Sequence, residues 1–588
     1  MTLATICGIV IFMVIMGFFM VISLLGMVAS DSASTKVKEN SVFVLKLDGV
    51  IDERAEAGSP LDALLDMGDM SSMGLDDLIS SIRKAKNNDD IKGIYLEGGV
   101  ASFDSPATAQ QLRDALKDFK KSGKWIVAYA DQYMQGSYYV ATVADKIYLN
   151  GEGMINFSGL GGKSEYMKGL YDKLGIKYQA AKVGKYKSYV ERNTQTGMSE
   201  YDREQRTAYL NGIWNYWLKE MAEGRKVKPE DLNQLANDSI IMFADTKDYV
   251  KSKLIDKVMF PEEIKAEIKN RLKLDKDDEI PQLTLSDMLN VKTDKDEEGE
   301  KIAIYYAYGS IVDNEALDYM SGGGHNIVGK RTAEDLRKLA DDDDVKAVVF
   351  RVNSPGGSAY GSEQIWHAIS QLKEKKPVIV SMGDYAASGG YYISCNADTI
   401  VAEPTTLTGS IGIFGIVPNF ESVAKKVGVS IDTEKTNDLA DMGNTLRPMT
   451  EYEKALVQKM VEKGYDLFTT RCADGRGMTQ AEIDAIGQGR VWTGTMALER
   501  GLVDVLGGLD DAIDIAVKKA GVEGYTLKSY PEQEGGFFSM FSDMKDNTIR
   551  QQMLKGDAAK IFNDVYTISQ MDKLDRIQAR MPYNIIIK

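Results

Sequence analysis

Ser388 stands among alanines and glycines in "GDYAASGGYYIS", directly after the apolar run "PVIVSMGD". Small neighbours would let a second chain approach its hydroxyl closely, as a nucleophile requires. A serine hydroxyl attacks poorly unless a base lies within hydrogen-bond reach, and histidine is the usual base. The two histidines are His325, after a glycine-rich loop, and His367, on a predicted helix. Neither has a reason to face Ser388, so the base must be sought among other residue types.

An internal repeat bears on that search. Residues 123–149 align without gaps with residues 376–402 at an offset of 253, which pairs Gly136 with Gly389. Upstream, "NNDDIKGIYLEGG" pairs with "DDDDVKAVVFRVNSPGG". A match of this length indicates two tandem copies of one structural unit.

The two copies differ at the residues that could do chemistry. Gln135 occupies the position that matches Ser388, and "NSPGG" of the second copy is matched by "GGVAS" in the first. Conversely, "VGKYKSYVE" of the first copy contains Lys187, whose counterpart at the same offset is Ala440. We therefore infer one composite site, with Ser388 from the second copy and Lys187 from the first.

Lysine acts as a base only when its amine is neutral. Its pKa must then fall from about 10.4 toward roughly 7–8, and burial between two domains can supply that shift. An attacking serine also needs donors for the oxyanion, and we expect the backbone N–H groups of Gly357 and Gly389 to provide them. Ser410, in "TGSIGIFG", is the hydroxyl expected to orient Lys187.

Apolar β-branched runs alternate with helical stretches in both copies, a pattern typical of α/β domains with a largely parallel sheet. Between the copies the chain is rich in charge, and near the C-terminus the pattern ends. The predicted organisation is an anchor at 1–30, a linker at 31–42, an N-terminal repeat at 43–265, a second linker at 266–300, a C-terminal repeat at 301–525 and a tail at 526–588.

The N-terminal segment has no charged residue before Asp31. About 20 apolar residues suffice to cross the ~30 Å hydrocarbon layer, so this segment predicts a transmembrane helix in contact with membrane lipid. A cleaved signal peptide is the competing interpretation, but its apolar region would be only roughly 7–15 residues long.

Composition narrows the function further. The chain has 588 residues and a net charge of −16, which disfavours nucleic acid as a partner because phosphate binding requires clustered Lys and Arg. Its three cysteines cannot form a disulfide framework, and no Cys/His spacing fits a zinc site. We therefore expect no metal and no cofactor.

Four motifs, "SPGG", "AASGGYYIS", "LTGSIGI" and "GKYKS", resemble the long, duplicated form of the signal peptide peptidase A family (protease IV, Ser/Lys peptidase family S49). The resemblance covers about residues 43–525 and the anchor. It implies tandem ClpP/crotonase-like α/β domains, a Ser388 nucleophile and a Lys187 base. It also implies a homotetramer on the outer, periplasmic face of a bacterial inner membrane that degrades released signal peptides as its peptide substrates. One departure is Lys185, which places a like charge two residues before Lys187.

Two rival functions remain open from the sequence. Crotonase relatives use similar glycine N–H pairs to hold acyl-CoA thioesters, and a catalytically inactive membrane scaffold would need no chemistry at all. Ser370 and Lys373 also form an S-x-x-K pair, but neither S-D-N nor K-T-G follows it, so coincidence explains it better.

Overall fold

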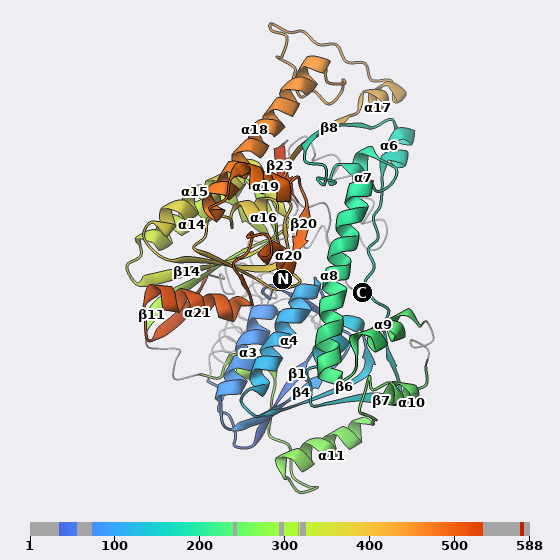
Figure 1. Cartoon of the computed structure of the whole chain (residues 1–588), viewed down its shortest axis with the longest axis vertical. Helices are drawn as coiled ribbons and strands as arrows, with labels where there is room; N and C mark the ends of the chain where they lie inside the picture. Colours follow the sequence, from blue (N-terminus) through green and yellow to red (C-terminus); the bar gives the residue numbers. More distant parts are fainter. Residues whose placement is uncertain are drawn as a thin grey trace, which may run out of the picture.

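The computed structural model describes residues 34–55, 73–238, 244–292, 299–315, 317, 325–532 and 577–580. Two α/β halves follow each other along the chain, as the predicted fold class requires (Figure 1). The expected transmembrane anchor at 1–30 lies outside these ranges. Within them, no helix is both long and apolar enough to cross a membrane.

A parallel sheet with the strand order β10-β1-β4-β6-β7-β9 forms the first half. Its strands are β1 (Ser41–Lys46), β4 (Ile91–Glu97), β6 (Trp125–Tyr133), β7 (Lys146–Ile155), β9 (Lys257–Val258) and β10 (Gln282–Leu283). The helices of this half are α3 (Leu75–Asn87), α4 (Pro106–Lys120), α5 (Gln135–Ala141), α6 (Lys168–Leu174), α7 (Glu191–Thr194), α8 (Glu200–Arg225), α9 (Pro229–Asn237), α10 (Thr246–Lys251), α11 (Pro261–Leu272) and α12 (Leu285–Leu289).

The second half repeats this plan with an eight-stranded sheet. Its main path is β20-β18-β16-β14-β11-β22, while β17 pairs with β16 and β21. The strands are β11 (Glu300–Tyr308), β14 (Val345–Ser354), β16 (Val378–Ala387), β17 (Thr399–Ala402), β18 (Leu407–Gly409), β20 (Val491–Thr493), β21 (Val505–Leu506) and β22 (Tyr525–Tyr530). The helices are α14 (Gly329–Asp341), α15 (Ala359–Lys373), α16 (Gly389–Tyr392), α17 (Glu421–Lys426), α18 (Glu451–Arg476), α19 (Gln480–Ile486), α20 (Gly494–Leu498) and α21 (Leu509–Ala520).

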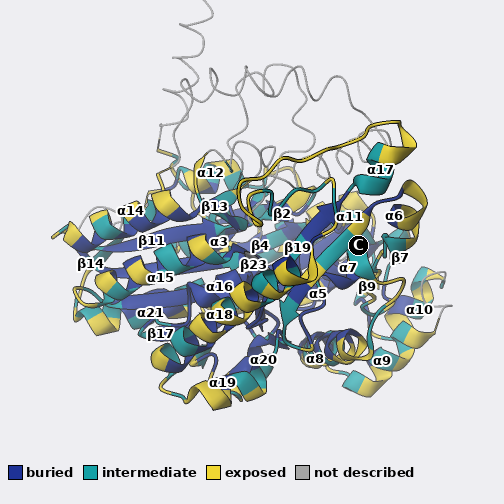
Figure 2. Ribbon diagram, turned by 90° about the horizontal axis from the view of Figure 1, so that it is seen from above, coloured by how far each residue is buried: buried dark blue, intermediate teal, exposed yellow. Residues whose placement is uncertain are grey.

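Strand β11 illustrates how helices cover both faces of the second sheet. Successive side chains of a strand point to opposite faces, so neighbours on β11 join different hydrophobic clusters. Ile302 and Ile304 belong to a cluster with Ala512 of α21, whereas Ala303 belongs to a cluster with Leu336 of α14. The sheet is therefore an inner layer, and Figure 2 shows its strands as buried ribbons between helices with exposed outer faces.

Two segments outside the expected repeats extend these sheets. Strand β10 lies in the stretch 266–300, which we expected to be a linker, and it pairs in parallel with β1. Strand β22 reaches past residue 525 and pairs in parallel with β11. Each half thus gains an edge strand at the same place, because the first strand of each sheet offers a free backbone edge there.

Each half also carries a small second sheet, and these differ in size. The first has the order β3-β2-β5, with strands β2 (Val50–Asp52), β3 (Met73–Gly74) and β5 (Ser102–Phe103). The second has the order β13-β12-β15-β23-β19-β8, with β8 (Lys177–Val183), β12 (Ser310–Val312), β13 (Asn326–Val328), β15 (Gly356–Ser358), β19 (Ile413–Asn419) and β23 (Ile577–Arg580). Its last strand, β8, belongs to the first half.

The first half therefore reaches across to the second. Strand β8 pairs antiparallel with β19 over its full length, from Val183 opposite Ile413 to Lys177 opposite Asn419. Figure 1 shows the long helix α8 running from the lower lobe toward the upper one, where α6 and β8 lie beside α17. This crossing brings the segment after β8, which contains Lys187, into the second half.

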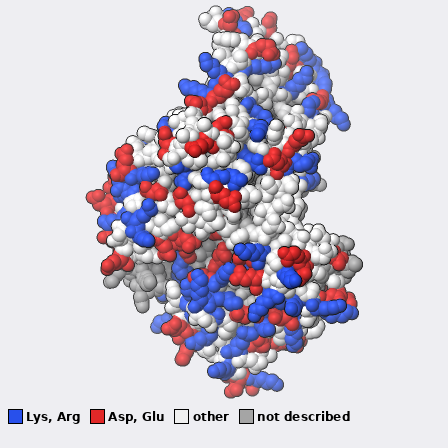
Figure 3. All heavy atoms as spheres, in the orientation of Figure 1, with Lys and Arg blue, Asp and Glu red and all other residues white. Residues whose placement is uncertain are grey.

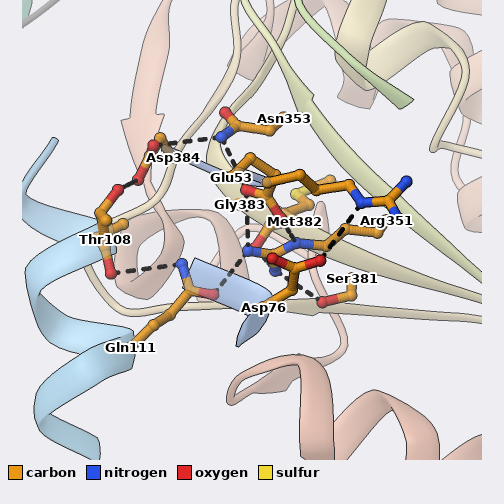
Figure 4. Close-up of polar contacts among 12 residues, drawn as sticks. Glu53, Asp76, Thr108, Gln111, Arg351, Asn353, Ser381, Met382, Gly383 and Asp384 are labelled. Atoms are coloured by element: carbon orange, nitrogen blue, oxygen red, sulfur yellow. Dashed lines mark hydrogen bonds and ion pairs between the residues drawn. The ribbon is translucent and has the colours of Figure 1, made fainter. Parts of the chain in front are cut away.

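A buried ion pair joins the two halves (Figure 4). Arg351 of β14 is 1% exposed and contacts Glu53 of the first half, with 2.5 Å between Nε and Oε1. Its Nη2 donates to Gln111 of α4 at 2.6 Å. Asn353 donates to Glu53 at 2.9 Å as well. The charged groups are thus satisfied on both sides of the junction, as burial requires.

Asp384 of β16 makes a second buried junction. Its Oδ1 accepts hydrogen bonds from Ser105 and Thr108 of α4, the latter at 2.6 Å. Burial raises the pKa of this carboxyl above its usual range, while those hydroxyl donors act in the opposite direction. Together with the Arg351 pair, these contacts fix the docking of α4 against the second sheet.

Candidate active site

Ser388 ends the buried strand β16 and precedes the short helix α16. Its φ of 57° and ψ of −114° are rare for a residue with a side chain, and such a backbone costs about 1–3 kcal/mol. The backbone N–H of Ser388 donates to Gly409 O at 2.8 Å, which ties the turn to β18. Although Ser388 occupies the N-cap position of α16, its side chain caps no helical N–H. Its hydroxyl is therefore available for another partner.

That partner is Lys187. Its Nζ lies 2.7 Å from Ser388 Oγ, within hydrogen-bond distance, although the two are 201 positions apart along the chain. The same amine donates to the carbonyl oxygen of Ser410 at 2.9 Å and to Ser410 Oγ at 3.1 Å. All three residues are fully buried. The structure thus brings together the serine, the lysine and the orienting hydroxyl that the sequence singled out.

Burial dominates the electrostatics of Lys187. Removing the amine from water lowers its pKa well below that of an ordinary lysine. Among the residues that the structure describes, no carboxylate forms an ion pair with Lys187 that would restore the charged form. The neutral amine, which can accept a proton, is favoured by this environment.

Helix α8 positions the loop that carries Lys187. Ser188 Oγ donates to Asp202 Oδ1 at 2.6 Å, and Gln205 Nε2 donates to the carbonyl oxygen of Tyr186 at 3.0 Å. Gln205 also accepts from the backbone N–H of Val491 at 3.1 Å, so the same side chain binds both halves. The lysine is consequently held by a hydrogen-bonded frame rather than by its own flexible side chain.

Close backbone packing completes that frame. A Cβ on Gly489, whose φ is 80°, would lie 2.6 Å from the backbone nitrogen of Lys187. Only glycine tolerates both this φ and this approach. Lys185, the departure noted in the sequence, is exposed, and its ammonium lies 5.4 Å from the ring centroids of Tyr186 and Tyr201. The lowered pKa of Lys187 comes from its burial and not from Lys185.

The two expected oxyanion donors lie on facing segments beside Ser388. Gly389 follows Ser388 directly, and Gly357 lies on β15, opposite Ile311 of β12. The neighbouring Gly356 has a φ of 100°, and a Cβ on it would lie 2.8 Å from the backbone nitrogen of Gly389. The N–H of Gly356 donates to Ser354 Oγ at 3.1 Å and is thus already occupied. The sequence did not single out Gly356, although "SPGG" includes it.

The first half has no such arrangement at the equivalent point. Gln135 is buried, and its amide binds the backbone of residues 158 and 159, accepting from Ser158 N at 2.9 Å and Gly159 N at 2.8 Å. Phe103, which occupies the register position of Gly357, packs its ring against Gly136. A structural glutamine and an aromatic ring therefore fill the place of the serine and the glycine loop.

Two other features that the sequence analysis considered can be placed in the structure. Ala440 is exposed in a stretch without strands, so the positional equivalence with Lys187 has no counterpart in space. After α17 the second half forms no strand that matches β8, and β8 of the first half pairs with β19 instead. Ser370 and Lys373 do not contact each other; they donate to the carbonyl oxygens of Trp366 and Asn396.

Comparisons with known proteins agree on one family. The profile described as "Peptidase family S49" matches residues 118–275 and 370–523. "Protease 4" of Haemophilus influenzae is 34% identical over 87% of this chain and 86% of its own. "Serine protease SPPA, chloroplastic" of Arabidopsis thaliana is 31% identical over 83% of this chain and 70% of its own.

Among solved structures, a mutant of ClpP1 from Listeria monocytogenes is similar over 36% of this chain and 94% of its own, with 16% identity and a TM-score of 0.24. The family matches cover both halves and most of the length of the relatives. The chain therefore belongs to peptidase family S49 and is a serine protease.

Proposed function

We propose that Ser388 and Lys187 form the catalytic dyad of this serine protease, an endopeptidase whose active site is shared between its two halves. The observation that carries the proposal is the 2.7 Å contact between Lys187 Nζ and Ser388 Oγ inside a fully buried environment. A depressed lysine pKa next to a strained serine is the combination that activates a hydroxyl without histidine. The remaining contacts of the amine go to Ser410, whose role is to orient it.

The proposed reaction proceeds through an acyl-enzyme. Neutral Lys187 takes the Ser388 proton while Oγ attacks the carbonyl carbon of the peptide bond. Backbone N–H groups of Gly357 and Gly389 stabilise the oxyanion. The protonated amine then gives its proton to the leaving nitrogen as the C–N bond breaks. Water, deprotonated by the same amine, attacks the acyl carbon and frees Ser388.

For the substrate we propose signal peptides that have been released from their precursors. Support comes from the family, whose members here include a protein named SPPA, and from the anchor predicted at 1–30. Such an anchor would hold the enzyme at the surface of the bacterial inner membrane, on its outer side. A homotetramer is part of the same proposal.

Figure 3 shows acidic and basic side chains interspersed over the face in view, without a large patch of one sign.

A serine-directed probe tests the dyad. We expect a fluorophosphonate to modify Ser388, and the modified protein to lose hydrolysis of a casein-derived peptide mixture. A protein modified elsewhere, or active without Ser388, would contradict the proposal. A crotonase-like enzyme would instead turn over acyl-CoA without modification at Ser388, and a scaffold would show neither reaction.

The substrate and the membrane need separate measurements. Full-length protein in vesicles is incubated with a synthetic signal peptide and with a soluble peptide of equal length, and the products are identified by mass spectrometry. Faster cleavage of the signal peptide is expected. Flotation of the full chain with vesicles, compared with residues 31–588, tests the anchor, and sedimentation in detergent tests the tetramer.

A further inference from the structure

A cavity of about 580 Å³ lies where the loop that carries Lys187 meets the segment between α19 and β20. Its lining combines cationic and aromatic side chains from both halves, namely Lys185, Tyr186, Arg490, Trp492 and Arg500. Ligand pockets in proteins measure roughly 300–1,000 Å³. The cavity is therefore large enough to hold a ligand, and its lining points to one that carries negative charge.

Aromatic rings hold the cations of this cavity in place. The guanidinium carbon of Arg490 lies 4.6 Å from the ring centroid of Tyr186 and 4.4 Å from that of Trp492. The guanidinium carbon of Arg500 lies 3.8 Å from the same Trp492 centroid, and the Lys185 ammonium lies 5.4 Å from that of Tyr186. Because a guanidinium stacks through its faces, its N–H edges remain available to a planar anion.

Arg490 has a buried donor that the fold leaves unused. Its Nη1 lies 2.8 Å from Tyr186 Oη and 2.8 Å from Glu204 Oε1. Its Nε, in contrast, is shielded from solvent and has no hydrogen-bond acceptor in the described part of the chain. Buried donors in native proteins nearly always have an acceptor, which can be a bound ion. An anion in the cavity would supply that acceptor.

The balance of charge around the cavity favours an anion with a single charge. Its lining carries three cations and one acid, Asp484, whose carboxylate already accepts hydrogen bonds within the fold. Glu204 pairs with Arg490 and Glu499 with Arg500, but these two carboxylates are 51% and 65% exposed, so solvent screens them. The excess of positive charge is thus small. A carboxylate, whose two oxygens match the edge of a guanidinium, fits better than a polyphosphate.

We propose that this cavity binds the carboxylate of a peptide, which is either the C-terminal group or an acidic side chain. Arg490 and Arg500 donate to the carboxylate, and the exposed Lys185 adds its charge. Ala485 and Ile486 also line the cavity and provide apolar contact for the residue that carries the carboxylate. Lys185, which departs from the family motif, thereby acquires a role outside the dyad.

The cavity lies against the loop that holds the proposed base. Gln488 lines the cavity, and its carbonyl oxygen accepts a hydrogen bond from the backbone N–H of Tyr186 at 2.9 Å. A Cβ on the next residue, Gly489, would lie 2.6 Å from the backbone nitrogen of Lys187. A released signal peptide has a free C-terminal carboxylate, whereas the same segment within a precursor has none. The site would therefore distinguish the two, and this consequence rests on the proposed function.

The experiment measures binding to full-length Ser388→Ala protein in detergent by fluorescence anisotropy. Three N-terminally labelled pentapeptides of Leu and Ala serve as probes: one with a free C-terminus, one with a C-terminal amide, and one amide with Glu as its last residue. Each is tested against Arg490→Lys, Arg500→Gln and Lys185→Gln, made in the same background. The matched control is Arg331→Gln, at an exposed site of the second half. Thermal unfolding checks that every variant is folded.

We expect the probe with a free C-terminus to bind at least tenfold more tightly than its amide. Arg500→Gln should weaken its binding by about 10–100-fold, as expected for the loss of a hydrogen bond between charged groups. Arg490→Lys should also weaken it, because lysine keeps the charge but lacks Nε and the planar edge. Lys185→Gln should weaken it several-fold, and Arg331→Gln should have no effect.

The amide that ends in Glu identifies the source of the carboxylate. Binding as tight as that of the free C-terminus means that the cavity accepts a side-chain carboxylate as well. Binding as weak as that of the plain amide means that it accepts the C-terminal group alone. Both results support a peptide carboxylate as the ligand.

Two results would overturn the inference. Equal affinity for the free C-terminus and its amide, or a preference that survives in both arginine variants, would reject the site. Displacement of the probe by inorganic phosphate at lower concentration than by unlabelled peptide would assign the cavity to phosphate instead. Hydrolysis of a reporter amide by wild type is measured in parallel, and its absence would contradict the proposed dyad without changing the binding result.

Discussion

At the turn after the long central strand of each sheet, the first half carries Gln135 and the second half carries Ser388. Gln135 accepts hydrogen bonds from the backbone of the next loop, so its side chain is fully used in holding the fold. Ser388 sits in a strained backbone conformation and binds Lys187 instead. The same strand-turn-helix unit thus serves packing in one half and presents a reactive group in the other.

The small sheet beside this turn also differs between the two halves. In the first half, the ring of Phe103 packs against Gly136 and fills the space beside the turn. In the second half, the equivalent register position is Gly357, and β23 lies in the space that is left. An aromatic side chain in the first half thus stands where the second half has a glycine and a paired strand.

Loss of either member of the dyad should have the largest effect on activity. We expect Ser388→Ala and Lys187→Ala each to reduce kcat by about 10³–10⁶-fold, because groups that act as one unit fail together. The double variant should be no slower than either single one. Circular dichroism and thermal unfolding check that the fold survives, and a Lys187→Ala variant within tenfold of wild type would contradict a shared site.

Loss of the buried ion pair between Arg351 and Glu53 should have the next largest effect, which is on the free energy of unfolding. Removing the guanidinium in Arg351→Met leaves Glu53 buried without its partner, and we expect a loss of about 3–5 kcal/mol in urea unfolding. Combining it with Glu53→Gln should recover much of that loss. Arg331→Met, at an exposed site of the same half, is the control and should be nearly neutral. Equal losses in both arginine variants would show that the junction does not join the halves.

The lowered pKa of Lys187 should appear in the pH dependence of both activity and stability. Activity requires the neutral amine, so kcat/KM should fall about tenfold per pH unit below the lysine's folded pKa, which lies well under 10.4. Between that pKa and about 10.4 the unfolded chain binds one more proton than the folded chain, so stability should increase with pH.

The control for this pH effect is Lys187→Met, in which the proton is absent. Over the same window the stability of wild type relative to this variant should increase by up to about 1.4 kcal/mol per pH unit. Unfolding curves of wild type and Lys187→Met at several pH values measure this difference in stability. A flat difference would mean that the amine is solvated.

Ser410 should contribute less than the dyad. Both Ser410→Ala and Ser410→Gly remove the hydroxyl while keeping the carbonyl that also contacts Lys187, and one such hydrogen bond corresponds to roughly 10–100-fold in kcat/KM. Ser370→Ala, in the unrelated S-x-x-K pair, should leave activity unchanged. If Ser410→Ala shifts the pH profile without lowering its plateau, Ser410 sets the pKa rather than the position of the amine.

A serine introduced into the first half should have the smallest effect on activity. We expect Gln135→Ser, in a Ser388→Ala background, to give no detectable hydrolysis, because position 135 faces the backbone of residues 158 and 159 and Phe103 still fills the adjacent space. Peptide products from this double variant would show that the two halves are closer in function than their contacts indicate.

Much of the site could be predicted from the repeat. The gapless alignment marked which copy lacks the serine and which lacks the lysine, and the structure then places Lys187 Nζ 2.7 Å from Ser388 Oγ. The sheets were predictable for a similar reason, since buried parallel strands are continuous apolar runs. The catalytic roles themselves stay a prediction until the variants are measured.

Other features of the structure have no recognisable signal in the sequence. Glu53 and Arg351 look like any charged surface residues in the sequence, because nothing local marks a pair 298 positions apart. The pairing of β8 with β19 depends on how the halves dock, so the offset that led to Ala440 failed where the two copies follow different paths. Strand β23 has only four residues and lies far from any repeat, and strands of that length are recognisable only by their partners.

With the proposed dyad, the crossing of β8 into the second half also sets when the enzyme becomes active. Ribosomes release Lys187 first, and 201 further residues must follow before Ser388 exists. Until both halves have folded and docked, the lysine stays in water with an ordinary pKa and the serine has no base. If the proposed dyad is the active site, a nascent, unfolded or dissected chain should hydrolyse no peptide, and proteolysis should begin only with the finished molecule.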